Sequence, residues 1–100
     1  MILPYTFRAA SHVEALVTHY LYQKQRPEAV RNLYKTLGQA SDAIIAGTAK
    51  VFPAPRPYPS LKEAGTYWVY FPPYWIAFRD REKPILSAVH YDASDMPNRA

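Results

Sequence analysis

The sequence predicts one α+β domain over residues 1–100, in which an antiparallel helical hairpin packs on one face of an antiparallel sheet. Two observations carry this prediction. Apolar residues recur at helical spacing in the first half of the chain. The last third, from Thr66 to Pro97, holds three runs rich in aromatic and β-branched residues, separated by two short breaks. The length of the chain suits a single domain with a modest core.

The N-terminal segment is expected to contribute a short strand and then a helix. Pro4 restricts a strand over residues 4–8 to the edge of a sheet. Ser11 and Glu14 have the spacing of a capping box, in which a serine caps the helix and a glutamate reaches back to it. The first helix is therefore expected from about residue 11 to residue 25.

A second helix and a stiff connector are expected next. Pro27 suits the first position of a helix, and Gly47 suits the left-handed cap after a helix that ends near Ala46. The link between the two helices is short, which predicts an antiparallel hairpin. Four prolines within residues 51–60 exclude a helix and a central strand there, so this stretch is expected to be an extended connector.

The three C-terminal runs are expected to form an antiparallel meander whose first hairpin turns at Pro72-Pro73. A loop of two or four residues pairs Tyr70 with Trp75. The four-residue loop is favoured, because proline cannot supply the positive φ of the usual two-residue turns. A loop of three or five residues would exchange the faces of the sheet. With the favoured register, the first face carries Tyr67, Val69, Phe71, Tyr74, Ile76 and Phe78, and we expect it to meet the helices.

The second face of the sheet carries Trp68, Tyr70, Trp75 and Arg79. Because the hairpin can cover only one face, the second face is expected to expose its aromatic residues and to bind a protein partner. Tryptophan, tyrosine and arginine are the residue types enriched in interface hot spots. The alternative is that the proline-rich connector covers part of this face.

Composition narrows the class of partner and of chemistry. The formal net charge of +4 favours an acidic partner. No apolar run is long enough to cross a membrane and no signal peptide is evident, so a cytoplasmic location without membrane contact is expected. The chain has no cysteine and its three histidines are not at ligand spacing, so neither a metal nor a cofactor is expected.

One set of residues has the chemistry needed to cleave RNA. It consists of Arg79, Arg81, His90 and Tyr91. Histidine and tyrosine can transfer protons, and arginine can hold the phosphate whose charge rises in the transition state. The alternative is that these are ordinary residues of a solvated turn and a strand end.

The order of these elements and several short motifs resemble the RelE/ParE superfamily, the toxins of type II toxin–antitoxin pairs. The resemblance covers nearly the whole chain. Ser87 and Ser94 stand where the family often has arginine. The motifs that carry the resemblance are Arg-Pro-Glu-Ala at 26–29, Phe52-Pro53, Tyr-Trp-Ile-Ala-Phe-Arg at 74–79, and His90 followed by Asp95-Met96-Pro97.

The resemblance implies a growth inhibitor that a cognate antitoxin neutralises. The long hairpin and the C-terminal ending are more similar to ParE, whose members inhibit DNA gyrase and are not known for a reaction of their own. The first alternative is a RelE-like endoribonuclease that cuts mRNA on the ribosome, with Arg79, Arg81, His90 and Tyr91 as its catalytic set. The second is an attenuated toxin that chiefly binds its antitoxin, because basic residues of the family are replaced here.

Overall fold

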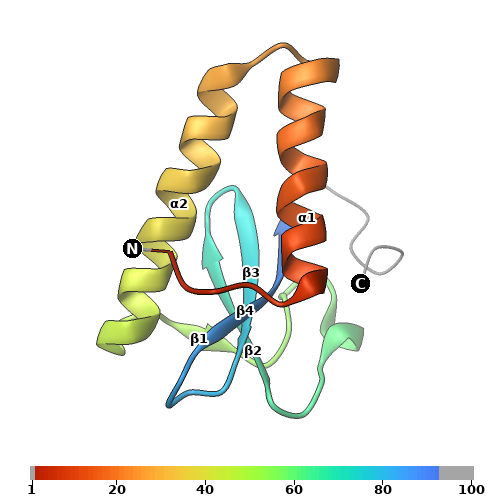
Figure 1. The fold of residues 1–100 in the computed structure, drawn as a ribbon. Helices are drawn as coiled ribbons and strands as arrows, with labels where there is room; N and C mark the ends of the chain where they lie inside the picture. The colour runs from red at the N-terminus through yellow and green to blue at the C-terminus, as the bar shows by residue number, and fades with distance from the viewer. Residues whose placement is uncertain (1, 93–100) are drawn as a thin grey trace.

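The structure, a computed structural model, describes residues 2–92 and shows a helical hairpin followed by an antiparallel sheet (Figure 1). The predicted fold class is confirmed. The predicted ending at Ser94 and Asp95-Met96-Pro97 lies outside the described residues. The helical elements are α1 (Phe7–Thr18), the π-helical turn η1 (His19–Gln23), α2 (Pro27–Ala46) and the 3₁₀ turn η2 (Pro59–Leu61); the strands are β1 (Val51–Phe52), β2 (Thr66–Phe71), β3 (Tyr74–Arg79) and β4 (Ile85–Tyr91).

The first helix begins earlier than its capping box predicts. Thr6 is the N-cap: its backbone is extended and its hydroxyl accepts a hydrogen bond from the Ala9 N–H at 3.1 Å. Ser11 lies inside the helix instead, where its hydroxyl donates to the Phe7 carbonyl at 3.0 Å. The expected strand over residues 4–8 is therefore reduced to one parallel bridge between Tyr5 and Leu86.

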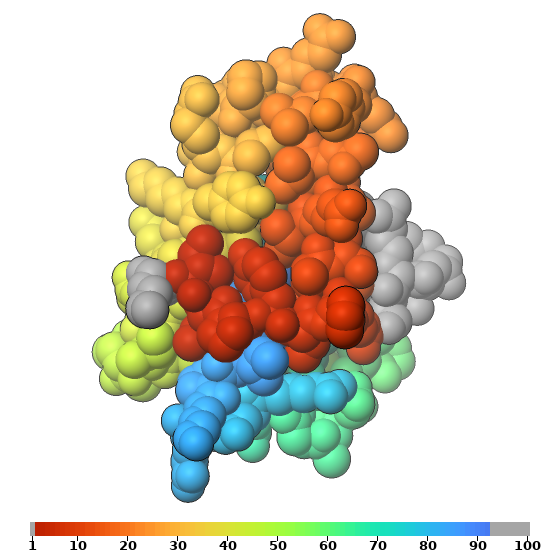
Figure 2. All heavy atoms as spheres, in the orientation of Figure 1, coloured from red at the N-terminus to blue at the C-terminus, as the bar shows by residue number. Residues whose placement is uncertain are grey.

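The hairpin itself agrees with the prediction. Pro27 opens α2, and Gly47 ends it in the left-handed conformation with φ 74°. The turn end of the hairpin, around η1, projects beyond the sheet and has no buried residue (Figures 1 and 2). Figure 2 shows the N-terminal segment on the viewer's face of the molecule, below the turn of the hairpin. In this segment the Leu3 N–H donates to the buried Ser41 hydroxyl at 3.0 Å.

The sheet has the order β1-β2-β3-β4 with antiparallel neighbours throughout. The predicted register is confirmed, because Tyr70 pairs with Trp75 and Trp68 pairs with Ala77. The loop has two residues, not the favoured four: pairing continues to Phe71 and Tyr74, and the Pro72-Pro73 peptide bond is cis. The preference for a wider loop was therefore wrong, although the pairing is unchanged.

The connector adds a fourth strand that the sequence did not predict. Val51 and Phe52 pair with Val69 and Trp68, so β1 forms an edge of the sheet. The strand is only two residues long because Pro53 follows it and cannot donate to a ladder. A short edge strand of this kind is compatible with the proline content that excludes a central strand.

The main core lies between the hairpin and the first face of the sheet. Helical residues Ala9, Val13, Leu33 and Leu37 are buried against this face. The assignment of the first face to the helices is therefore confirmed. The strand residues buried in this cluster are Val69, Tyr74, Ile76, Phe78, Leu86 and Val89, with Tyr67 and Phe71 partly buried beside them.

Candidate functional site

The second face of the sheet does not expose its tryptophans. Trp68 is 3% and Trp75 is 2% exposed, and both lie in a second apolar cluster with Ala77 and Ala88. The expectation that this face exposes them is wrong. The alternative is confirmed instead, because the proline-rich connector covers them. Of the four residues expected to bind a partner, Tyr70 is half-buried and only Arg79 is exposed.

The connector, residues 51–62, packs on this face through its apolar side chains. Phe52 meets Trp75 edge-on at 5.5 Å between ring centroids, and Tyr58 and Leu61 pack on the same cluster. Tyr70 closes the other side of Trp75 at 4.7 Å, while its hydroxyl donates to the Asp92 carboxylate at 2.8 Å. That hydrogen bond raises the pKa of Tyr70, because the neighbouring carboxylate opposes loss of the phenolic proton. The sheet is thus covered on both faces.

The four candidate nuclease residues do not converge. On the second face, Arg79 pairs with Ile85 at one end of the ladder, and His90 pairs with Trp75 toward the other. Four strand positions separate Arg79 from Trp75, about 13 Å along the strand. The other two residues lie on the first face. There the Arg81 guanidinium sits 5.1 Å from the Tyr67 ring centroid, and Tyr91 packs edge-on against Tyr74.

His90 belongs to a buried aromatic cluster. It is 3% exposed, its ring centroid lies 4.4 Å from that of His12, and it stacks on Trp68 at 6.0 Å. His12 is half-buried and its Nδ1 accepts a hydrogen bond from the Val89 N–H at 3.1 Å. Both histidines are held between α1 and β4, where they contribute to packing.

A pair of tyrosines joins the hairpin to the sheet. The hydroxyls of Tyr20 and Tyr74 lie 2.6 Å apart, and Tyr74 is 3% exposed. Burial, followed by this hydrogen bond, raises the pKa of Tyr74 far above its ordinary value. A phenol held so firmly in its protonated form cannot act as a base near neutral pH, so this pair is structural.

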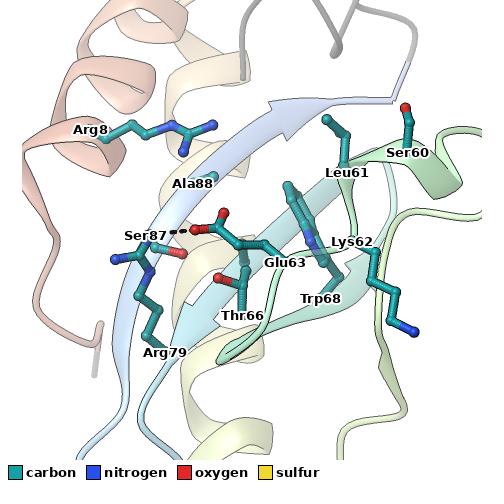
Figure 3. A pocket seen from close by; sticks show the side chains of 11 residues that line it. Arg8, Ser60, Leu61, Lys62, Glu63, Thr66, Trp68, Arg79, Ser87 and Ala88 are labelled. Atoms are coloured by element: carbon teal, nitrogen blue, oxygen red, sulfur yellow. Dashed lines mark ion pairs between the residues drawn. The ribbon is translucent and has the colours of Figure 1, made fainter.

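A cavity of about 270 Å³ opens at the edge of the covered face, between the start of α1, strand β4 and the segment after η2 (Figure 3). Its walls combine charge with buried polar side chains. Thr66 is 7% exposed, and among residues 2–92 neither its hydroxyl nor the Trp68 Nε1 has a hydrogen-bond partner. The residues important here are Arg8, Glu63, Thr66, Trp68, Arg79 and Ser87.

Two guanidinium groups and one carboxylate face this cavity. The Glu63 side chain lies between Arg8 and Arg79, and its carboxylate forms an ion pair of 3.5 Å with Arg79 (Figure 3). Arg8 reaches toward the cavity from the first turn of α1 and forms no ion pair with any of residues 2–92. Lys62 points its ammonium group away from the other side chains (Figure 3).

A bulge in the sheet explains how Ser87 reaches the cavity. Ala77 pairs with Ala88 but Phe78 pairs with Leu86, so Ser87 is the extra residue of β4. Bulges of this kind re-aim one side chain. Among the residues at this cavity, Trp68 and Arg79 were expected to be functional from the sequence. Arg8, Glu63 and Thr66 were not expected, because they belong to no motif and are distant along the chain.

Metal and membrane signals are absent from the part of the chain that the structure describes. No group of three or more histidine, aspartate or glutamate side chains is placed to hold a metal ion within residues 2–92. In the same range, no helix combines the length and the apolar composition that crossing a membrane requires.

Comparison of the chain with protein-family models, with curated proteins and with solved structures finds no match.

Proposed function

We propose that the protein is the toxin of a type II toxin–antitoxin pair, that it acts in the cytoplasm on DNA gyrase, and that a cognate antitoxin neutralises it. Two features support the proposal. The motifs at 26–29 and 74–79 occur in the order typical of RelE/ParE toxins. The helical hairpin followed by an antiparallel sheet is the architecture that this resemblance implies.

The observation that favours gyrase inhibition over mRNA cleavage is the dispersal of the candidate nuclease residues. General acid–base catalysis needs the acid, the base and the cationic groups within hydrogen-bonding reach of one phosphate. Here Arg79 and His90 lie toward opposite ends of one face, and Arg81 and Tyr91 lie on the other face. His90 is also buried. An inhibitor that acts by binding requires no such convergence.

The antitoxin would meet a surface different from the one the sequence suggests. Arg79 is exposed and Tyr70 half-buried, so both stay within reach of an acidic segment. A protein segment can pack on the Trp68 and Trp75 rings only if the connector moves off the sheet. We therefore place Arg79 and Tyr70 at the antitoxin interface and assign the tryptophans to the core of the free protein.

Controlled expression in bacteria tests the proposal. Expression of the full chain alone should slow growth, and coexpression of the small acidic protein encoded by the adjacent reading frame should restore it. Ribosome-bound mRNA should stay intact during the arrest. Unimpaired growth with folded protein present contradicts the toxin function. Cleaved mRNA that becomes intact with Arg79→Ala or His90→Phe establishes the endoribonuclease instead.

A further inference from the structure

We propose that the cavity beside Arg79 binds the phosphate group of a small phosphate monoester. This inference concerns the free protein and does not depend on the toxin function. It is carried by three features of the cavity: a pair of guanidinium groups, an internal carboxylate that already lies between them, and buried polar side chains that lack a partner.

The position of Glu63 shows that the cavity accommodates an oxyanion. Its carboxylate lies between Arg8 and Arg79 (Figure 3). The Glu63–Arg79 ion pair is loose: the 3.5 Å separation exceeds the roughly 2.7–2.9 Å of a strong charge-assisted hydrogen bond, and both side chains are about half exposed. An exposed pair of this kind contributes little to stability. An external oxyanion with more charge can therefore displace the Glu63 carboxylate.

Two hydrogen-bond donors at the cavity have no acceptor among residues 2–92. The Thr66 hydroxyl and the Trp68 Nε1–H are buried and have no partner among residues 2–92. Buried polar groups nearly always have a partner, and an oxyanion bound in the cavity would supply one for the Thr66 hydroxyl at its wall. Both residues line the cavity, and both atoms are closed to solvent. Movement of Glu63 toward solvent would leave Arg79 to meet a ligand oxyanion at this cavity, which Ser87 also lines.

Charge and size select the class of ligand. Once Glu63 turns outward, the two guanidiniums present two positive charges. A phosphate monoester carries about −1.5 to −2 at pH 7 and offers three terminal oxygens, whereas a carboxylate offers one charge and two oxygens. The cavity of about 270 Å³ is slightly smaller than the roughly 300–1,000 Å³ of drug-sized sites. The best fit is a monoester of a small molecule.

Nuclear magnetic resonance of the full, ¹⁵N-labelled chain provides a direct readout, because the protein has only two indole N–H signals. Titration with phenyl phosphate up to about 10 mM, the range for a weak small-ligand site, should shift the Trp68 indole signal progressively. The Trp75 indole is the internal control, since Trp75 is buried outside the cavity. Inorganic phosphate should shift the same Trp68 indole signal.

Three charge variants sharpen the test. Arg79→Ala should weaken phenyl phosphate binding about tenfold or more, the effect of losing one charged hydrogen bond. Glu63→Gln should tighten binding of phenyl phosphate, because it removes the competing carboxylate while the side chain stays nearly the same size. Lys62 also lines the cavity, but its ammonium group points away from the other side chains (Figure 3). Lys62→Ala removes the same charge as the arginine variant and should leave affinity unchanged.

The proposal fails if the Trp68 indole signal does not move, or if Lys62→Ala weakens binding as much as Arg79→Ala. Equal shifts with acetate contradict the assignment to a dianion. Tighter binding of a short oligonucleotide without terminal phosphate contradicts a small monoester and points to a nucleic-acid backbone instead. Weaker binding by Glu63→Gln contradicts the competing role of Glu63.

Discussion

The Nδ1 atom of His12 accepts a hydrogen bond from the backbone N–H of Val89, 3.1 Å away, and so ties helix α1 to strand β4. A ring nitrogen that accepts this bond carries no proton, which places the ring proton of neutral His12 on Nε2. The same ring contacts His90. The histidine at the expected capping box is therefore a packing residue and not a surface one.

Replacing this histidine should destabilise the fold. His12→Ala leaves the Val89 N–H without its acceptor, and an unsatisfied buried donor costs about 1–3 kcal/mol of unfolding free energy. Urea denaturation measures the loss. His19→Ala is the matched control, because the His19 side chain hydrogen-bonds to the Gln23 side chain in an exposed position. Equal losses in the two variants would contradict the role of the Val89 bond.

The Tyr20–Tyr74 pair should make stability fall in alkali. The folded state raises the pKa of Tyr74, so above the ordinary value of 10.0 the unfolded chain releases this proton first. The contribution of Tyr74 to the free energy of unfolding should therefore be constant below pH 10 and decline above it. Tyr74→Phe should cost about 1 kcal/mol at pH 8 but show a shallower decline above pH 10.

The exposed Tyr22 provides the control for that comparison. Tyr22 is 77% exposed, so Tyr22→Phe should leave the stability at pH 8 unchanged. Urea denaturation at several pH values gives the slope for each protein. An alkaline slope that is identical in Tyr74→Phe and in the unmodified chain would show that Tyr74 holds its proton no better than an ordinary tyrosine.

The cover that the connector forms should depend on Phe52. This ring meets Trp75 edge-on and is half-buried, so Phe52→Ala should cost about 1–3 kcal/mol, less than a fully buried phenylalanine. Iodide should then quench tryptophan fluorescence more strongly. Phe7→Ala is the control, because Phe7 is 95% exposed and its loss should change neither value. Unchanged quenching in Phe52→Ala would mean that other connector residues exclude solvent.

Gly38 offers a stabilising substitution. It lies inside α2, and a Cβ built there meets no atom within 4 Å. Gly38→Ala should raise the free energy of unfolding by about 0.5–1 kcal/mol, because alanine loses less backbone freedom in a helix. Thermal denaturation followed by circular dichroism measures the gain. A loss of stability would show that the helix needs the glycine for a close approach.

The elements predicted correctly are those that local pattern determines. The pairing of Tyr70 with Trp75 was predicted correctly although the loop length was not, because loops of two and of four residues at Pro72-Pro73 give the same register. Gly47 and Pro27 mark the ends of α2 through their own backbone preferences. The start of α1 was missed because Thr6 caps the helix without the glutamate that completes a capping box.

The candidate site could not be predicted from local sequence pattern. Both sheet faces are aromatic, and only the path of the connector shows that it covers Trp68 and Trp75. The cavity joins Arg8 and Glu63 to the last two strands, and Ser87 turns toward it through a bulge that the sequence does not signal. Sites assembled from such distant residues require the tertiary structure.

A gyrase supercoiling assay with the purified protein tests the proposed function most directly. We predict that the folded protein inhibits supercoiling, that the protein encoded by the adjacent reading frame relieves the inhibition, and that heat-unfolded protein has no effect. Supercoiling that proceeds normally in an excess of folded protein, beside mRNA cut in a ribosome-containing reaction, would contradict the gyrase-inhibitor proposal and favour the nuclease.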